Sequence, residues 1–348
     1  MQRLTLAGRL LITALILGAG YVAFTMFGGK KLLEKAADKA QQEQNANTQT
    51  VPNTEASSQS DNVASSDNPA ANTNSVASSS ASTFDYQAPQ PVDGRLKGVV
   101  ELGASGFNSF VVKIDKQKNW KLEKAEFGNS LVTENMASDE DIRIGLKKYI
   151  GGMLDYGVGG RDIHFVVSSG AIKSEVTLKI IKALKSLNYY VNTVTAEQEG
   201  AYGLKVVLPK QFENEAFVTD IGSGNTKISW AASGGVTSLE SYGAKYFQNN
   251  VSDATVATEV TTKVKQIPSA NRKMCFIIGG VPFELAKIAR KGKERYTILN
   301  APDAYKLENA KSKAGLNIYK AIVQTTGCQQ FIFDWDANFT IGFLLGLP

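Results

Sequence analysis

Histidine and cysteine are nearly absent from this chain. Its 348 residues include one histidine, His164, and two cysteines, Cys275 and Cys328. A single histidine excludes a zinc site built on several histidines, and two thiols are too few for a disulfide framework or a four-cysteine zinc site. The pair can be two reduced thiols in a core, so cysteine usage leaves the cellular compartment undecided.

The loop motifs of two common enzyme classes are also missing. No Gly-x-Ser-x-Gly elbow precedes a helix, and the single histidine begins an apolar strand, which argues against a serine hydrolase. No Gly-x-x-x-x-Gly-Lys-Ser/Thr loop is present, so a P-loop nucleotide site is excluded. A basic cluster at residues 287–295 is typical of a solvated helix end, and we expect no nucleic-acid partner.

Hydrophobic residues make up 43% of the chain and charged residues 20%, which is enough apolar side chain for one large domain or two of medium size. The charge is unevenly distributed. Residues 1–40 carry six Lys/Arg and two acids, whereas residues 41–92 carry five acids and no Lys or Arg. The formal net charge of +5 suits an anionic ligand but does not require one.

Residues 10–29 form a run of 20 uncharged, mostly apolar residues between Arg9 and Lys30. Because a helix of this length spans the hydrocarbon layer, we predict a single-pass membrane anchor within residues 1–40 that contacts the lipid bilayer. A cleaved signal peptide is the alternative. Lysines after the run outnumber arginines before it, which slightly favours a cytoplasmic position for the rest of the chain and leaves a periplasmic one open.

Residues 41–92 are rich in Ser, Asn, Ala, Gln and Thr and contain few apolar residues before Phe84. Such a segment cannot bury enough apolar surface to offset the entropy lost on ordering, so we predict a disordered linker. A flexible chain of this length reaches roughly 40 Å, which would hold a folded domain near the membrane and let it rotate.

Two segments far apart in the chain share one pattern. Each reads as an apolar strand, a turn rich in Gly and Ser, and a returning apolar strand, and the two align at Glu101-Leu-Gly103 and Asp220-Ile-Gly222. Backbone N–H groups at such turns can bind phosphate oxygens, and a carboxylate at each strand end suits hydrated Mg²⁺. The repeat predicts a duplicated domain whose two turns face one cleft.

The segments around these hairpins alternate between strand and helix patterns, which is typical of an α/β domain with crossover connections. We expect a first lobe over residues 93–214 and a second over 215–348. The other predicted elements are helices from residues 138, 174 and 309, strands over 164–168, 191–194 and 331–333, a strand with the Gly279-Gly280 turn and a helix after it, and an apolar segment over 338–348 that completes the second lobe.

The segment Val194-Thr-Ala-Glu-Gln-Glu-Gly-Ala-Tyr-Gly203, followed by the hairpin at Asp220, resembles the exopolyphosphatase/guanosine pentaphosphatase (Ppx/GppA) family. That family has an Asp-x-Gly-Ser loop, a Thr-Ser-Ala-x-Arg segment, a Glu-rich helix start and an Asp-x-Gly-Gly-Gly-Ser-Thr-Glu loop, in this order. The corresponding segments here begin at Glu101, Ser168, Glu197 and Asp220. The resemblance implies the duplicated, two-lobed actin-like (ribonuclease H-like) α/β fold.

The resemblance also implies a site. Glu199 would be the catalytic base that activates water for attack on a terminal phosphoryl group, and Glu101 and Asp220 would hold Mg²⁺. The ligand would be polyphosphate or a nucleotide polyphosphate, and a homodimer stays open. The expected phosphate-binding residues are Gly103, Ala104, Ser105, Lys173, Gly222, Ser223, Gly224, Asn225 and Lys227.

Lys227 departs from the family pattern, which has a second acidic residue important for catalysis at this position. A lysine can bind phosphate, but while protonated it cannot ligate a metal or act as a base. Three functions therefore remain as hypotheses. They are a membrane-tethered phosphohydrolase of the exopolyphosphatase type, a catalytically inactive phosphate or nucleotide sensor, and an actin-like ATPase in which filament contacts matter more than hydrolysis.

Overall fold

The structure is a computed structural model that describes residues 84–103, 106–127, 139–172 and 175–348. The predicted anchor over 1–40 and most of the predicted linker over 41–92 lie outside the described residues. Within the described part of the chain, no helix is both long and apolar enough to cross a membrane.

The first sheet has five strands in the order β3-β2-β1-β4-β5. The two hairpin pairings, β1 with β2 and β2 with β3, are antiparallel, whereas β4 lies parallel to both β1 and β5. The strands are β1 (Arg95–Gly103), β2 (Gly106–Ile114), β3 (Trp120–Phe127), β4 (Ile163–Val167) and β5 (Tyr190–Thr193).

The second sheet repeats this arrangement. Its order is β8-β7-β6-β9-β11, with β10 added antiparallel at the edge. As in the first sheet, the two hairpin pairings, β6 with β7 and β7 with β8, are antiparallel, whereas β9 lies parallel to both β6 and β11. The duplication predicted from the two hairpins is therefore present in strand order and direction. The strands are β6 (Ala216–Ile221), β7 (Asn225–Ala232), β8 (Gly235–Tyr242), β9 (Met274–Ile278), β10 (Tyr296–Ile298) and β11 (Gln330–Asp334).

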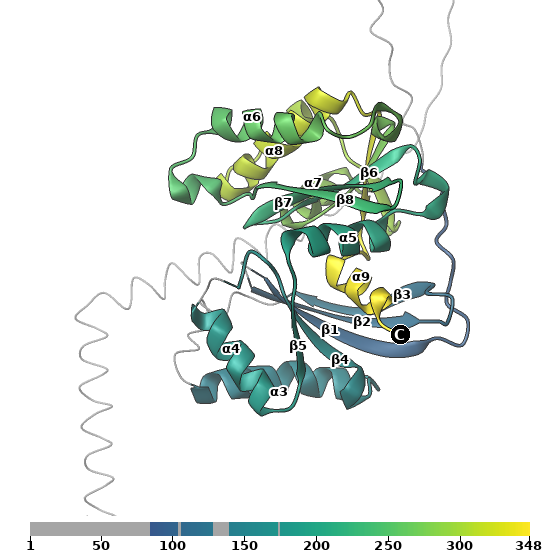
Figure 1. Ribbon diagram of the computed structural model, residues 1–348, viewed down its shortest axis with the longest axis vertical. Helices are drawn as coiled ribbons and strands as arrows, with labels where there is room; N and C mark the ends of the chain where they lie inside the picture. The colour runs from purple at the N-terminus through teal and green to yellow at the C-terminus, as the bar shows by residue number, and fades with distance from the viewer. Residues whose placement is uncertain (1–83, 104–105, 128–138, 173–174) are drawn as a thin grey trace, which may run out of the picture. The chain divides into compact units, whose positions relative to one another are not determined.

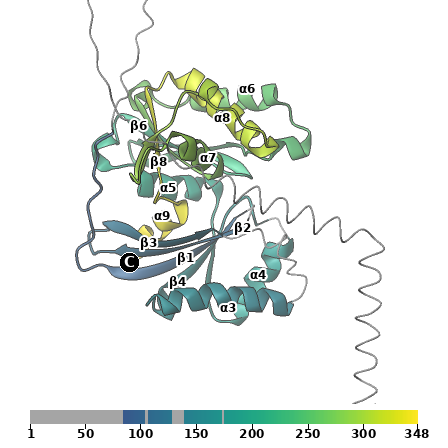
Figure 2. The same ribbon diagram turned by 180° about the vertical axis from the view of Figure 1, so that it is seen from behind.

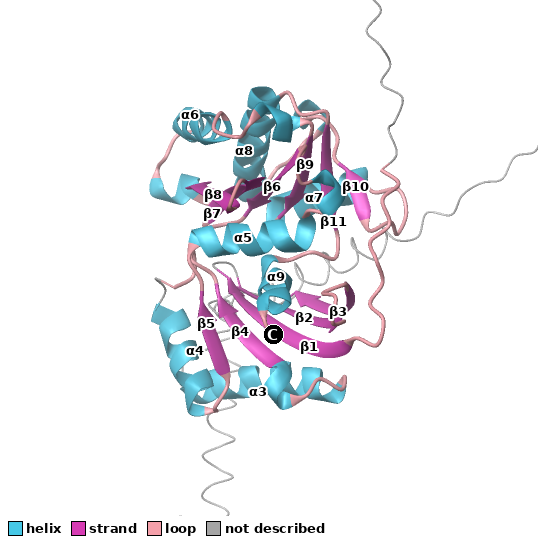
Figure 3. Cartoon of the chain, turned by 45° about the vertical axis from the view of Figure 1, so that its right-hand side comes forward, coloured by secondary structure: helices cyan, strands magenta, loops and turns pink. Residues whose placement is uncertain are grey.

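Helices cover both faces of both sheets, with α5 and α9 between the sheets (Figures 1 and 3). Helices α3 and α4 pack on the outer face of the first sheet, and α6, α7 and α8 pack on the outer face of the second. The view from behind shows the same order of layers (Figure 2). The helices are α3 (Asp139–Asp155), α4 (Glu175–Ser186), α5 (Ala196–Val207), α6 (Asp253–Val264), α7 (Gly280–Ala289), α8 (Ala310–Thr326) and α9 (Phe339–Gly346).

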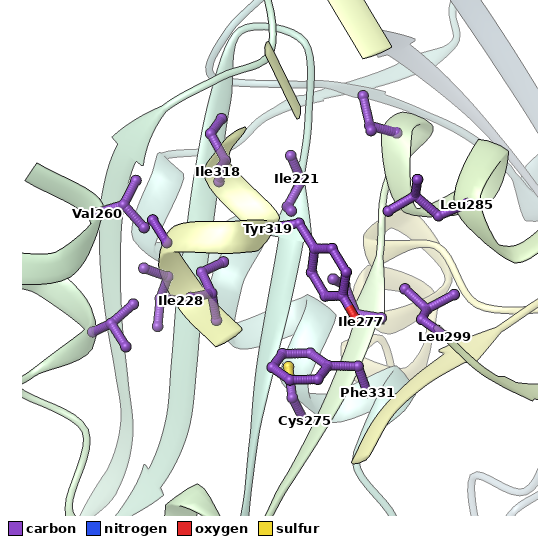
Figure 4. Packing of buried hydrophobic residues seen from close by; sticks show 14 of the residues in the cluster. Ile221, Ile228, Val260, Cys275, Ile277, Leu285, Leu299, Ile318, Tyr319 and Phe331 are labelled. Carbon is purple, nitrogen blue, oxygen red and sulfur yellow. The ribbon is translucent and has the colours of Figure 1, made fainter. Parts of the chain in front are cut away.

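The central strands are continuous apolar runs because both of their faces are buried. Successive side chains of a strand point to opposite faces, so Val99 packs in the layer between the sheets and Val100 packs under α3 and α4. The outer core of the second sheet is shown in Figure 4, where the ring of Tyr319 lies edge-on to that of Phe331 with centroids 5.1 Å apart. Cys275 is fully buried beside Phe331, as a free thiol.

The closing apolar segment, predicted to complete the second lobe, lies between the two sheets (Figure 3). It forms α9, which packs on α5 and also contacts β1 and β2 of the first sheet. Close contact between the two helices depends on Gly342, because a Cβ there would lie 2.0 Å from the carbonyl oxygen of Tyr202. Periodicity alone predicted an apolar element here, but it does not say which of two equally apolar surfaces that element covers.

The last residues of the predicted linker, 84–92, are described by the structure. Phe84 contacts two rings of the second lobe and Phe212 just before it. The N–H of Val92 donates to Asp115 of the first lobe. The ring of Phe84 lies 5.7 Å from that of Phe212, 5.6 Å from Phe276 and 5.4 Å from Tyr296. We call these rings and that of Tyr86 the aromatic cluster; its members are Phe84, Tyr86, Phe212, Phe276 and Tyr296.

Candidate functional site

The two strand-end acids occupy equivalent positions in the two hairpins. Glu101 of β1 is paired across the hairpin with Asn108 of β2, and Asp220 of β6 is paired across its hairpin with Lys227 of β7. In each case the partner follows the acid by the same number of residues. The repeat therefore brings an acid to the same place twice, facing an amide in one lobe and an ammonium group in the other.

Glu101 is held by two side-chain amides. Its Oε2 accepts hydrogen bonds from Asn108 Nδ2 at 2.9 Å and from Asn338 Nδ2 at 3.0 Å. Asn338 also begins α9, since its Oδ1 accepts from the backbone N–H of Thr340 at 2.9 Å. Burial raises the pKa of Glu101, and the two amides oppose that rise without cancelling it.

Glu199 lies in the first turn of α5, which starts with a capping box. Thr195 accepts from the backbone of Gln198, whose side chain accepts from the backbone of Thr195. Helix α5 reaches the strands of the second sheet because Gly200 lacks a side chain, since a Cβ there would lie 1.8 Å from Ser238 Oγ. The carboxylate of Glu199 is thus buried on the side of α5 that faces β7 and β8.

Each carboxylate oxygen of Glu199 contacts one partner. Its Oε1 accepts from the backbone N–H of Ser169, and its Oε2 forms an ion pair with Lys227 Nζ. The Glu199 side chain has 0% of its surface exposed and that of Lys227 has 6%. Burial raises the pKa of Glu199, and Lys227 opposes this effect.

Lys227 keeps its charge although it is buried. Burial by itself lowers the pKa of Lys227, but the carboxyls of Asp220, Glu199 and Glu101 outweigh this and leave the pKa raised. Burial also raises the pKa of Asp220, and Lys227 is the group that opposes this rise. One ammonium group is therefore the shared counter-charge of three buried carboxyls.

The turn of the second hairpin is only partly available to a ligand. The N–H of Gly222 donates to the carbonyl oxygen of Asn225 at 3.0 Å, so this predicted phosphate-binding amide is engaged within the turn. The side-chain amide of Asn225 donates to Ser169 Oγ at 2.9 Å and to Glu240 Oε1 at 2.7 Å. Asn225 thus joins the second hairpin to the loop after β4 of the first sheet.

The two hairpin turns meet at one cleft, as the repeat predicted. The cleft has a volume of about 610 Å³ and is bounded by residues of both sheets and by the start of α7. Position 279 must be glycine, because its φ is +110° and a Cβ there would lie 2.4 Å from the carbonyl oxygen of Ile221. The predicted site residues that line the cleft are Glu101, Gly103, Asp220, Gly222, Ser223, Gly224, Asn225 and Lys227.

The predicted base lies beside this cleft and contacts Lys227, one of the residues that line it. Lys227 is among the residues that line the cleft, whereas Glu199 is not found among the described lining residues. The predicted phosphate-binding residues Ala104, Ser105 and Lys173 lie outside the described residues.

The structure adds side chains that sequence patterns did not single out. Lys311, in the first turn of α8, lines the cleft near Gly280, and burial lowers its pKa. Asn338 is recognisable from sequence only as a helix cap, and its contact with Glu101 spans the length of the folded region. Phe283 and Trp335 form an aromatic wall, with ring centroids 5.3 Å apart.

Comparison with solved structures then decides the fold. The structure superposes on a PPX-GPPA enzyme of Aquifex aeolicus with a TM-score of 0.57, at 16% sequence identity, over 73% of this chain and 99% of that one. The fold is that of the Ppx/GppA proteins. An exopolyphosphatase of Cytophaga hutchinsonii has a TM-score of 0.56 at 12% identity, over 73% of this chain and 99% of that one.

An exopolyphosphatase-like protein gives a third comparison, with a TM-score of 0.55 at 11% identity over 73% of this chain and 98% of that one. No family model and no curated protein sequence matches the chain. The likeness to the Ppx/GppA proteins therefore concerns the arrangement of the backbone, and the chemistry has to be argued from the side chains of this chain.

The residues do not fit the divalent cation that the Ppx/GppA resemblance implies. The carboxylate of Glu101 already accepts from two amides, and the ammonium group of Lys227 faces Asp220 and Glu199. A divalent cation at this place would be repelled by the ammonium charge. Within the described part of the chain, no group of three or more His, Cys, Asp or Glu side chains is arranged to hold a metal ion.

Proposed function

We propose that this chain binds phosphoanhydrides, such as polyphosphate or a nucleotide polyphosphate, in the cleft between its two sheets and does not hydrolyse them. The observation that carries the proposal is the position of Lys227, which pairs with Glu199 and lines the cleft. A general base must come within hydrogen-bond reach of the water that it activates. Glu199 is fully buried, with its two oxygens directed to Ser169 and Lys227.

Several features of the cleft favour an anionic ligand. Lys227 and Lys311 supply positive charge, and α7 begins at the cleft with Gly280, so the positive end of its dipole lies there. The turn residues Ser223 and Gly224 also line the cleft. Phosphoanhydrides match this combination of lysines, a helix N-terminus and a glycine-rich turn.

Binding and turnover by the full-length protein test this proposal. Calorimetric titration with pyrophosphate, tripolyphosphate and ATP measures binding, and a phosphate-release assay on the same ligands measures hydrolysis. We expect binding of at least one ligand without release of phosphate. Release that Glu199→Gln abolishes would show a working base and would overturn the inactive-site proposal.

The control for that substitution is Glu197→Gln. Glu197 is an exposed acid two positions earlier on the same helix, and it lines a different pocket. The Glu197→Gln substitution removes one negative charge from α5 without changing the contacts of Glu199. A loss of phosphate release seen only with Glu199→Gln can therefore be assigned to Glu199.

We also propose that residues 10–29 anchor the protein in a membrane, with the linker separating the anchor from the folded region. The support is the length of the uncharged run. Carbonate extraction of membranes should leave the full chain in the pellet, whereas a chain without residues 10–29 should appear in the supernatant. Recovery of both chains in the supernatant would argue for a cleaved signal peptide.

A further inference from the structure

Lys227 stands at the meeting point of three carboxyl groups from three different elements. Glu101 comes from β1, Glu199 from α5 and Asp220 from β6. Glu199 forms an ion pair with Lys227, Asp220 is its partner across the hairpin, and the charge of Glu101 is close enough to raise the pKa of Lys227. Carboxylate oxygens are the usual ligands of magnesium and calcium, but in their observed arrangement around Lys227 these three carboxyls form no metal site.

The positive centre in this cluster is part of the chain. The Lys227 side chain is 6% exposed, and a lysine is rarely buried to that degree unless it is paired. Removing it would leave three buried carboxyls without a counter-charge. A metal ion would have to be recruited from solution for that purpose, whereas the ammonium group is always present.

We propose that the Lys227 ammonium group takes the place of a divalent cation in this cluster, so that the cleft binds phosphoanhydrides without a metal ion. The identity of the ligand rests on the proposed function, but the exclusion of metal does not. A cation entering the cluster would meet the ammonium charge and would have to break the ion pair with Glu199. Because Lys227 lines the cleft, its remaining donors are placed to meet a ligand oxygen.

The corresponding position of the first hairpin supports this assignment. Asn108 occupies there the place that Lys227 occupies in the second hairpin, and its amide satisfies Glu101 with no positive charge. The position opposite the strand-end acid therefore carries a neutral donor in the first hairpin and a cation in the second. An acid at position 227 would instead add a fourth carboxyl to the cluster.

Terbium(III) is a direct probe of this inference, because it is a hard cation that binds oxygen ligands as Ca²⁺ does. Trp335 lines the cleft, so excitation of tryptophan should sensitise the luminescence of a terbium ion bound there. For the full-length wild-type protein we expect no Mg²⁺-sensitive terbium luminescence: adding excess Mg²⁺ should leave the tryptophan-sensitised signal unchanged. We expect Lys227→Glu to bind terbium at least roughly tenfold more tightly, a change of the size that altered surroundings produce at metal sites.

Two further variants keep the comparison informative. Lys265→Glu makes the same charge change at an exposed position that does not line the cleft, and we expect its terbium luminescence to match that of the wild type. Lys227→Gln removes the cation without adding an acid, and it should gain terbium binding even if Lys227→Glu does not fold. Wild-type luminescence that Mg²⁺ removes would overturn the inference, and so would folded Lys227 variants that gain no terbium binding.

A ligand arm separates this inference from the proposed function. Calorimetric titration of the wild type with pyrophosphate should give the same affinity in EDTA as in Mg²⁺, once the binding of Mg²⁺ to pyrophosphate itself is subtracted. In EDTA, Lys227→Gln should weaken binding roughly tenfold or more, the usual value of a charged hydrogen bond. Pyrophosphate binding that requires Mg²⁺ would overturn the proposal of metal-free binding. If pyrophosphate binds under no condition, the proposed function is overturned, and the terbium experiment alone decides whether Lys227 excludes a metal ion.

Discussion

The two hairpins are built alike but place different residues opposite the strand-end acid. Both place an acid near the end of the first strand, both face the same cleft, and the partner is Asn108 in one and Lys227 in the other. Glu101 is satisfied by neutral amides, whereas Asp220 shares a cation with Glu199. The repeated backbone therefore sets the positions of the strand-end acid and of the residue opposite it, while the identity of that opposite residue sets the charge beside the acid.

The largest effect should come from removing the cation. Lys227→Met leaves Glu199 buried without its ion-pair partner, so we expect the free energy of unfolding to fall by about 3–5 kcal/mol at neutral pH. Urea denaturation followed by circular dichroism measures this. The double variant Lys227→Met/Glu199→Gln should recover part of the loss, and a single variant as stable as the wild type would show that the ion pair is not the main contact of Lys227.

The equivalent change in the first hairpin should cost less. Asn108→Leu removes one of the two amides that donate to Glu101, while Asn338 remains. We expect the free energy of unfolding to fall by about 1–3 kcal/mol, because a buried carboxyl loses one of its two hydrogen bonds. The same urea measurement checks this, and a loss as large as that of Lys227→Met would mean that the two hairpins are not as different as their charges indicate.

The pH dependence of stability should show that both strand-end acids are held in unfavourable surroundings. Burial raises the pKa of Asp220 and of Glu101 in the folded state. An acid with a raised pKa holds its proton longer in the folded state, so its contribution to stability is full below the ordinary carboxyl pKa and is lost as the pH rises through the raised pKa.

Asp220→Asn removes that titration and should therefore gain stability relative to the wild type as the pH rises. Glu101→Gln should change in the same direction. Urea denaturation at a series of pH values gives the result. If Asp220→Asn is instead the less stable protein and loses more as the pH rises, the attraction between Asp220 and Lys227 outweighs the cost of burying the Asp220 carboxyl.

The smallest effect on stability should come from the other lysine of the cleft. Lys311→Gln removes a charge that is not part of the carboxyl cluster, so we expect the free energy of unfolding to change by no more than about 0.5 kcal/mol. Its affinity for pyrophosphate should nevertheless fall, because Lys311 lines the cleft. A large loss of stability without a change in affinity would place Lys311 among the structural contacts of α8.

The sequence was sufficient to predict the elements that depend on local pattern. The hairpins at Glu101 and Asp220, the helix start at Glu199 and the Gly279 turn are all present, because apolar alternation and glycine turns are local signals. The predicted duplication is also present, since the two sheets share one strand order apart from the added β10. The family resemblance agrees with the fold found by structural comparison.

Contacts that join distant segments could not be predicted in this way. The hydrogen bond between Asn338 and Glu101 spans most of the folded chain, and no spacing rule connects the two residues. The ion pair of Lys227 with Glu199 depends on how α5 packs on β7, which Gly200 permits. The pattern placed Glu199 correctly at a helix start, but its burial behind Lys227 is a property of the packing.

The aromatic cluster has a mechanical consequence. The chain meets the rings of the second lobe at Phe84 before it enters the first strand of the first lobe at Arg95. Tension on the residues before Phe84 would therefore be carried first by the second lobe, although the first lobe comes earlier in the chain. Rings can be peeled away one at a time, whereas the hydrogen bonds of β1 must be sheared together. A weak pull at Phe84 would therefore free the residues that precede Arg95 before it disturbs the cleft.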